Sequence, residues 1–336
     1  MCKLSNVRTD MADERVDEYK KVNNLTEIDG VKVESKEEKL SASFCAKVTT
    51  VDILNENGKH ALDKEVGKYV TIEIPEVEFL PDEDREKLTQ ILGKEIAEQV
   101  STISQKKLKS VLVVGLGNIY VTPDALGPKV VTGINVTRHI IKYAKELLTS
   151  PVNEISAISP GVMGTTGIET GEIIKSVVNE VKPDVIIAID SLASLSVSRV
   201  GRTIQLGNTG IIPGAGIGNK REAINMQTLG VPVIAIGVPT VVESAVIVNE
   251  CLDLFIQKLQ NESKSNEYLN KLKEQDNYEE IKEALVPNDY NMVVTPKEID
   301  DLIEKMKDVI AKRDKLCSVK QSKFKQKQNI KVNSIL

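Results

Sequence analysis

The sequence contains no tryptophan, and aromatic residues make up only 3% of its 336 residues. Proteins that bind single-stranded nucleic acid stack the bases on exposed aromatic side chains, so this scarcity argues against such a surface. It argues equally against a sugar-binding cleft lined by aromatic residues. A formal net charge of -5 does not favour nucleic acid as a ligand either. We therefore expect no nucleic-acid partner.

Residues with metal-binding or nucleophilic side chains are also few. The four cysteines form no C-x-x-C pair, which argues against a zinc ribbon and leaves a disulfide framework without support. The two histidines belong to no H-E-x-x-H motif, and the sequence has no G-x-S-x-G motif. The common templates of zinc proteases and serine hydrolases therefore do not fit this chain.

Long hydrophobic runs are absent too. No apolar run reaches the roughly 18 residues that a membrane-spanning helix needs, and the start of the chain has no apolar signal-peptide segment. Hydrophobic residues make up 41% of the sequence and charged residues 28%, which is typical of a soluble globular protein. We expect a cytoplasmic protein that has free thiols and does not span a membrane.

The order of the predicted elements indicates an α/β fold. Up to residue 109 the chain reads as a helix, three short β-like segments that suggest a small accessory β-sheet, and a second, charged helix over 82–107. From residue 110, buried strands alternate with helices, which favours a mostly parallel sheet with helices on both faces. We therefore predict an N-terminal region over 11–109, a core with a C-terminal helix over 110–317, and a disordered basic tail over 318–336.

The predicted core begins with a strand and a glycine-rich turn. Residues 111–114 are apolar and rich in β-branched side chains, so they predict a buried strand. After a tight turn, Thr122 is placed to cap a helix that has Pro123 at its first position and Asp124 in its first turn. Strand-Gly-x-Gly also begins dinucleotide-binding motifs, but Tyr120 stands where their third glycine would be. The pattern instead places a carboxylate at the carboxyl edge of the sheet, where α/β folds carry their chemistry.

A second carboxylate ends a later predicted strand. The apolar run over 185–189 is followed directly by Asp190, so this residue is expected at the same edge of the sheet as Asp124. Two close carboxylates share a proton because both cannot ionise cheaply, and such a pair can activate water and protonate a leaving amine. Alternatively, the two residues hold one divalent metal ion that activates the water. Each aspartate alone also fits a structural role at a helix start or a strand end.

Glycine clusters at 161–167 and 214–218 suggest loops whose backbone N–H groups face a ligand. The segment that ends at Lys220 lacks the Lys-Ser/Thr ending of a phosphate-binding P-loop. Exposed backbone also pairs with an extended peptide, so we favour loops that line a substrate, with Gly161 and Gly164 as candidate contacts. A module that binds a nucleotide or a phosphorylated ligand is the alternative.

Several longer motifs together resemble the germination proteases of spore-forming bacteria. They are G-L-G-N-I-Y-V-T-P-D-A-L-G-P at 115–128, P-G-V-M-G-T-T-G-I-E-T-G-E-I-I-K at 160–175, K-P-D-V-I-I-A-I-D-S-L-A-S at 182–194, P-G-A-G-I-G-N-K-R at 213–221 and T-L-G-V-P-V-I-A-I-G-V-P-T-V-V at 228–242. The resemblance implies an endopeptidase of the spore core that degrades small acid-soluble spore proteins during germination. It also implies a homotetramer, a self-processing zymogen and a fold similar to that of hydrogenase-maturation proteases.

The resemblance assigns functions to individual residues. The two aspartates proposed as catalytic in the family fall on Asp124 and Asp190. We expect them to act without a cofactor; the alternative is that they hold one divalent metal ion. Acidic positions in the family's substrates need cationic subsites, for which the candidates are Lys129, Arg138, Arg199, Lys220 and Arg221.

The chain departs from the family pattern at several positions. Asn208 and Ile212 stand where the family motif has an acid and a histidine, so we expect no acid or histidine chemistry there. Ser191 and Leu195 also replace the residues of the family motif.

The start of the chain resembles a family substrate. Family substrates are cut between an acidic residue and a large apolar one, with an alanine next and an acid soon after. Residues 10–14 read D-M-A-D-E, so we predict self-cleavage between Asp10 and Met11, which makes residues 1–10 a propeptide. The same residues also fit a plain helix cap.

Overall fold

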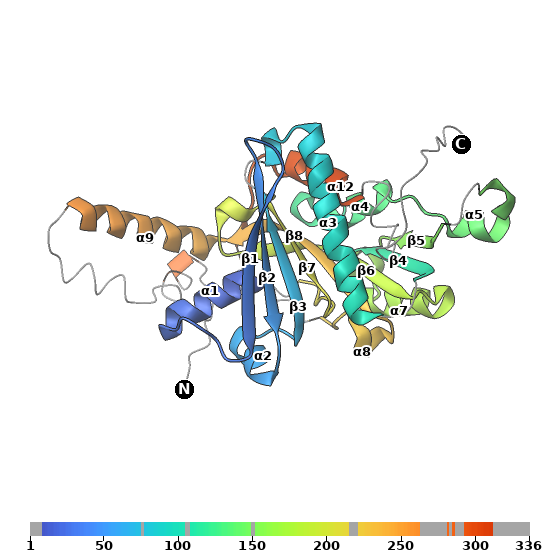
Figure 1. Ribbon diagram of the computed structural model, residues 1–336, viewed down its shortest axis with the longest axis horizontal. Coiled ribbons are helices and arrows are strands. Elements are labelled where there is room, and N and C mark those ends of the chain that lie inside the picture. Colours follow the sequence, from blue (N-terminus) through green and yellow to red (C-terminus); the bar gives the residue numbers. More distant parts are fainter. Residues whose placement is uncertain are drawn as a thin grey trace.

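One nine-stranded β-sheet forms the centre of the molecule (Figure 1). The computed structural model describes residues 9–74, 77–104, 108–148, 152–214, 221–262, 281, 284–285 and 292–311. The strand order is β1-β2-β3-β7-β8-β6-β4-β5, and β9 pairs with β8. The strands are β1 (Val31–Lys39), β2 (Cys45–Ile53), β3 (Gly67–Glu73), β4 (Ser110–Gly115), β5 (Glu154–Ile158), β6 (Val185–Ser194), β7 (Thr203–Gly207), β8 (Val233–Glu243) and β9 (Val293–Val294).

Four strands of the α/β core, β4, β5, β6 and β8, are parallel, as the alternation of strands and helices predicts. β4 pairs with β5 on one side and with β6 on the other, and β6 pairs with β8. Nearly every residue of β6 is buried, which is why its sequence is a continuous apolar run instead of an alternating pattern. The predicted α/β fold class is confirmed.

The predicted accessory strands are present, and they continue the core sheet. β1, β2 and β3 form an antiparallel group that joins the core where β3 pairs with β7. β7 in turn pairs antiparallel with β8. The N-terminal region and the core therefore share a single sheet.

Helices cover both faces of this sheet. Val111 and Val113 of β4 pack in the hydrophobic cluster of α3, α4 and α12, whereas Leu112 and Val114 pack in the cluster of α7. Successive side chains of a strand point to opposite faces, so the two clusters lie on opposite sides of the sheet. The helices of the described part are α1 (Ala12–Asn23), α2 (Glu56–Leu62), α3 (Asp82–Ile103), α4 (Leu126–Gly133), α5 (Arg138–Tyr143), α6 (Met163–Thr166), α7 (Thr170–Val181), α8 (Met226–Leu229), α9 (Ser244–Glu262) and α12 (Ile299–Ala311).

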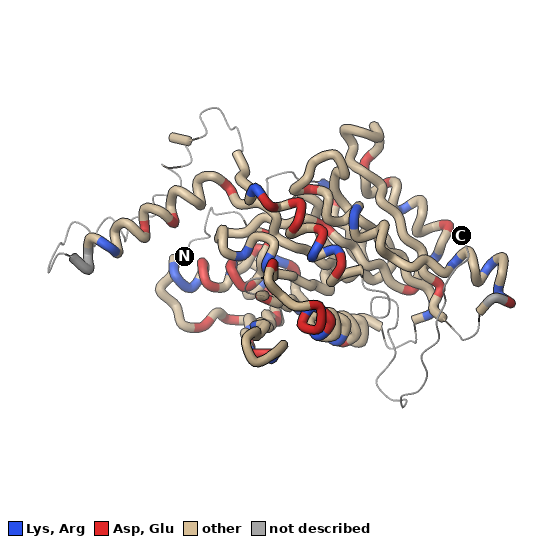
Figure 2. Tube along the Cα trace, turned by 90° about the horizontal axis from the view of Figure 1, so that it is seen from above, with Lys and Arg blue, Asp and Glu red and all other residues tan. Residues whose placement is uncertain are grey.

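Helix α9 extends away from the rest of the molecule (Figure 1, Figure 2). It exposes the apolar side chains of Leu254 and Phe255. Among the helices of the described residues, none is long and apolar enough to cross a membrane. Charged residues of both signs are spread over the chain in Figure 2.

Several sequence predictions fall outside the described residues or at their limits. The predicted charged helix over 82–107 is α3, which ends at Ile103. The predicted tail over 318–336 lies outside the described residues, as do residues 1–8 of the predicted propeptide. The division of the chain into these regions stays a prediction.

Candidate active site

The parallel pairing of β4 with β6 brings Asp124 and Asp190 to one cavity. Gly115, the last residue of β4, lies opposite Ile189 of β6, and the N–H of Leu116 donates a hydrogen bond to the Ile189 carbonyl at 2.8 Å. The turn after β4 therefore lies beside Asp190. Both aspartates line the same cavity at this edge of the sheet.

Asp124 is held by the turn that precedes it. Its Oδ2 accepts a hydrogen bond from the N–H of Asn118 at 2.8 Å. Gly117 has a φ of 108°, and a Cβ there would lie 2.1 Å from the Asp124 carbonyl oxygen. Only glycine therefore lets the turn approach Asp124 this closely.

The helix start at this site differs from the prediction. A short 3-10 helix spans Thr122–Asp124, its N-cap is Val121, and α4 begins only at Leu126. The prediction of Thr122 as an N-cap is therefore wrong by one residue, although Pro123 does stand at the start of the turn. The tight turn is stabilised by the hydrogen bond to Asp124 instead of a side-chain cap.

Asp190 lies within β6, and not at its end as the sequence predicts. The strand continues to Ser194 because it keeps its parallel partner β8, although the pairing shifts register between Leu192 and Ala193. The Asp190 side chain is only 5% exposed, and its Oδ1 accepts the N–H of Ser191 at 2.9 Å. The pairing with β8 and the hydrogen bond from Ser191 thus hold this carboxyl group in place.

The two carboxyl groups differ in their tendency to ionise. Burial raises the pKa of Asp190 well above its ordinary value, and the nearby carboxylates of Asp124 and Asp10 raise it further. Burial also raises the pKa of Asp124, but a backbone hydrogen bond and the Arg221 guanidinium oppose that effect. Asp190 is therefore the group that keeps a proton, while Asp124 ionises first.

The candidate substrate contacts are only partly gathered at this cavity. Gly161 and Arg221 line it. Gly164 is not among its lining residues, and no other atom lies within 4 Å of where its Cβ would be. Lys220 lies outside the described residues.

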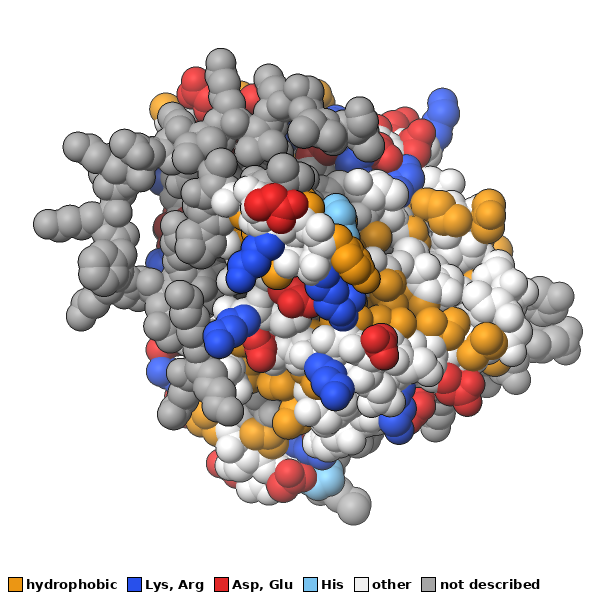
Figure 3. Space-filling model, turned by 90° about the vertical axis from the view of Figure 1, so that its right-hand side faces the viewer, with side chains coloured by type: hydrophobic (Ala, Val, Ile, Leu, Met, Phe, Trp, Pro, Cys, Tyr) orange, Lys and Arg blue, Asp and Glu red, His pale blue; other side chains and the backbone are white. Residues whose placement is uncertain are grey.

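The other cationic candidates are engaged elsewhere. Lys129 pairs with Glu304 at 2.9 Å, and Arg138 pairs with Glu154 at 2.7 Å. On the face shown in Figure 3, Lys and Arg side chains stand among acidic and apolar ones. Arg221 is thus the cationic candidate that the described residues bring to the cavity.

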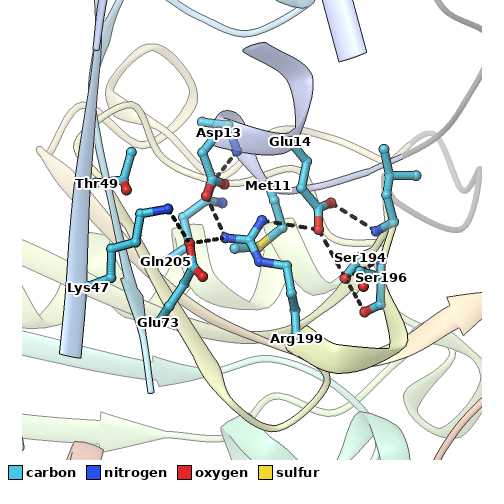
Figure 4. A network of polar contacts seen from close by, with 12 residues as sticks. Met11, Asp13, Glu14, Lys47, Thr49, Glu73, Ser194, Ser196, Arg199 and Gln205 are labelled. Atoms are coloured by element: carbon cyan, nitrogen blue, oxygen red, sulfur yellow. Dashed lines mark hydrogen bonds and ion pairs between the residues drawn. The ribbon is translucent and has the colours of Figure 1, made fainter. Parts of the chain in front are cut away.

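Arg199 belongs to a buried ion-pair network at the start of α1 (Figure 4). Its guanidinium pairs with Asp13, with Glu14 at 3.2 Å and with Glu73 at 3.2 Å. Glu14 also accepts the N–H of Leu195 at 2.9 Å. This network fastens the first turn of α1 to the segment that follows β6, so the position of Arg199 is structural.

A third carboxylate lines the cavity, and sequence reasoning did not place it there. Asp10 is expected only at a cleavage site, yet it faces the cavity together with Asp124 and Asp190. Its Oδ2 accepts the N–H of Ala193 at 2.9 Å, and its own N–H donates to the Ala193 carbonyl at 3.2 Å. The signal that points to it is the match of residues 10–14 to a substrate, since a substrate must enter the active site.

The fit of a metal ion rests on the same acids. Asp124 and Asp190 are the two carboxyl groups that would hold it. Within the described ranges, no group of three or more His, Cys, Asp or Glu side chains is arranged to hold a metal ion.

Comparison with known sequences identifies the family. The sequence profile of the germination proteases matches residues 7–273 and 267–329. The chain belongs to the germination protease family. It is therefore a protease, as its motifs predict.

Known germination proteases are similar to this chain over nearly their whole length. That of Clostridium perfringens is 47% identical over 312 residues, which cover 92% of this chain and 94% of the relative. The germination protease of Clostridium acetobutylicum is 42% identical, with the same coverage. That of Priestia megaterium is 40% identical over 344 residues and covers 91% of each chain.

A solved structure shows a weaker likeness. It is a [NiFe] hydrogenase maturation protease, HycI, from Thermococcus kodakarensis, with 16% sequence identity and a TM-score of 0.29. The match covers 44% of this chain and 80% of that chain.

The positions that depart from the germination protease motifs have local contacts. Asn208 accepts the N–H of Lys68 at 2.9 Å and so joins β3 to the segment after β7. Ile212 is 47% exposed and does not line the cavity, whereas Ser191 does line it. Leu195 packs against Ala245 and Val246.

Proposed function

We propose that this protein is an endopeptidase that cleaves small acid-soluble spore proteins during germination, with water activated by Asp124 and Asp190. The observation that carries the proposal is the meeting of these two carboxyl groups in one cavity with unequal tendencies to ionise. Membership in the germination protease family supports the substrate class.

The unequal pair suits the hydrolysis of a peptide bond. Ionised Asp124 takes a proton from a water molecule as its oxygen adds to the scissile carbonyl carbon. Protonated Asp190 then supplies a proton to the leaving nitrogen as the carbon–nitrogen bond breaks. Arg221 stands close enough to lower the pKa of both groups, and it is the candidate contact for an acidic substrate residue.

The proposed reaction requires no metal ion. An acid and a base at the two positions are sufficient for the proposed hydrolysis. Loss of activity on removal of divalent ions would instead favour the metal-dependent mechanism with the same carboxylates.

We also propose that the chain is made as a zymogen and removes its own first residues by cutting between Asp10 and Met11. Asp10 already lies in the cavity of the two catalytic candidates, which supports this choice of bond. N-terminal sequencing of the activated protein is expected to start at Met11. Activated protein that retains Asp10 would contradict the choice of this bond.

The resemblance to the germination proteases also supports a cellular location and an oligomeric state. We propose that the protein acts in the spore core as a homotetramer. Sedimentation analysis of the purified protein at several concentrations tests the tetramer, and a monomer throughout would contradict it.

The function itself is tested by Asp124→Asn and Asp190→Asn, each assayed for cleavage of a small acid-soluble spore protein. Each substitution keeps the shape of the side chain and removes its acid–base chemistry, so we expect a loss of at least about 100-fold. Asp184→Asn is the matched control, because Asp184 lies next to the other end of β6 and binds the N–H groups of Lys109 and Ser110. Wild-type rates in a folded Asp190→Asn protein would refute the proposal.

A further inference from the structure

The carbonyl group of Asp10 is held by two side-chain donors. Its oxygen accepts a hydrogen bond from Lys64 Nζ at 2.7 Å and another from Gln205 Nε2 at 2.8 Å. The donors come from segments far apart in the sequence, so the tertiary fold alone gathers them here. This carbonyl belongs to the peptide bond between Asp10 and Met11.

Lys64 is an unusual partner for a peptide oxygen. It follows α2, and its ammonium lies 5.5 Å from the centre of the Tyr69 ring. Lys64 is partly buried, and burial lowers the pKa of its ammonium against the raising effect of the Asp10 carboxylate. Desolvating a cation is costly, and a neutral donor would satisfy a carbonyl equally well. A cation at this oxygen is favoured when the oxygen acquires negative charge.

Gln205 fixes the peptide from the side of β7 (Figure 4). Its Nε2 binds the Asp10 oxygen, and its Oε1 accepts the N–H of Ala12 at 2.6 Å. The amide group of Gln205 thus forms hydrogen bonds to the backbone on both sides of Met11, and Gln205 itself is buried. The bond is held in a single orientation before any reaction occurs.

The nitrogen of the same peptide bond also has a defined partner. The N–H of Met11 donates to Thr9 Oγ1 at 3.0 Å, and the Thr9 hydroxyl donates to Glu14. The carbonyl and the nitrogen are therefore both held by side-chain oxygens or nitrogens. Met11 is fully buried, so the bond does not move freely.

We propose that Lys64 and Gln205 are catalytic residues for the self-cleavage of the Asp10–Met11 bond, in which they stabilise the oxyanion. This inference rests on the proposed self-processing. Ionised Asp124 takes a proton from water as the water oxygen adds to the Asp10 carbonyl carbon, and the negative charge on the carbonyl oxygen lies between Lys64 Nζ and Gln205 Nε2. Protonated Asp190 gives its proton to the Met11 nitrogen as the carbon–nitrogen bond breaks, which leaves an amine on Met11 and a carboxylic acid on Asp10 that then loses its proton.

The test measures the rate of conversion of the full chain to the chain that starts at Met11, by mass spectrometry of the intact protein. Lys64→Met keeps much of the side-chain volume and removes the charged donor. We expect conversion about 100- to 1,000-fold slower, the range found when one oxyanion donor is removed. Gln205→Leu is expected to act in the same direction. Lys64→Arg keeps the charge and is expected to convert faster than Lys64→Met.

The matched control is Lys59→Met, the same substitution at a lysine of α2 that pairs with Glu65 at 2.8 Å. This variant is expected to convert at the wild-type rate. Thermal unfolding of every variant shows whether it folds. Conversion of folded Lys64→Met at the wild-type rate would overturn the inference. Failure of both Lys64→Met and Gln205→Leu to fold would also overturn it, because the two donors would then be structural.

The inference and the proposed function fail in different ways. A wild-type chain that neither trims itself nor cleaves a small acid-soluble spore protein is not the proposed peptidase. A wild-type chain that cleaves this substrate but trims itself at another bond contradicts the proposed self-processing site and the inference that rests on it. A chain that trims itself at the Asp10–Met11 bond at a rate independent of Lys64 contradicts only the inference.

Discussion

Replacing Arg199 by methionine should destabilise the protein strongly. Arg199 is the cation of a network that contains two buried carboxylates, Asp13 and Glu14, whose residues are 8% and 7% exposed. Methionine fills much of the space of the arginine but leaves both acids without their charge partner. Glu73, the third acid, is more exposed and is solvated more easily.

The magnitude follows from the burial of the partners. Removing one member of a buried ion pair costs about 3–5 kcal/mol, because an uncompensated charge stays in the interior. An exposed pair contributes only about 0–1 kcal/mol. Since both carboxylates lie at the start of α1, we expect the free energy of unfolding of Arg199→Met to fall by about 3–5 kcal/mol at neutral pH.

Urea unfolding monitored by circular dichroism measures this loss. The control is Arg202→Met, since Arg202 binds Glu78 with a side chain that is 38% exposed, and its loss should cost at most about 1 kcal/mol. Burial raises the pKa of Glu14 and Arg199 opposes this effect, so the pKa rises further in the variant. A raised carboxyl pKa gives stability at low pH that is lost as pH rises through the folded-state pKa. The loss of unfolding free energy in Arg199→Met should therefore be smaller at acidic pH. Equal losses of unfolding free energy for Arg199→Met and Arg202→Met at neutral pH would refute the reasoning.

Three further predictions concern the cavity. Gly117→Ala places a Cβ 2.1 Å from the Asp124 carbonyl oxygen at a φ of 108°. We therefore expect the free energy of unfolding to fall by at least about 1–3 kcal/mol and most of the peptidase activity to be lost. Gly164→Ala, with no atom near its Cβ, should keep the wild-type stability and activity. Asp190→Asn should become more stable than the wild type as pH rises above about 4. Because the pKa of Asp190 is raised in the folded state, the wild type loses stability as pH rises toward that pKa, by up to about 1.4 kcal/mol per pH unit. Urea midpoints of the two proteins that run parallel across this pH range would contradict the assignment of the proton to Asp190. Exhaustive chelation of divalent ions should leave cleavage of a small acid-soluble spore protein unchanged, and activity that returns only with added metal would favour the alternative mechanism.

The repeated pattern of strands and helices made the fold class predictable. The apolar runs at 111–114, 185–189 and 233–236 are each long enough for a strand that is buried on both faces, and they became β4, β6 and the first part of β8. The limits of the elements were less predictable. β6 runs past Asp190 because β8 continues beside it, and this pairing depends on residues more than 40 positions away.

The two aspartates were also identified from the sequence, but their relation was not. Each follows an apolar run in the sequence, which predicts a place near the carboxyl edge of the sheet. The order β8-β6-β4 then makes β4 and β6 direct neighbours. This adjacency lets the Asp124 carboxylate raise the pKa of Asp190, an effect that requires a short distance in space.

The sequence alone determined the class of fold, the family and the bond at which self-cleavage is proposed, since these depend on patterns within single segments. The tertiary structure decided which groups surround that bond. Lys64 and Gln205 are 54 and 195 residues from Asp10, and no local pattern marks them. They meet the Asp10 carbonyl because the antiparallel strands β3 and β7 carry the N-terminal region into the core sheet. Contacts of this kind arise from strand pairing over long sequence distances, which local propensities do not encode.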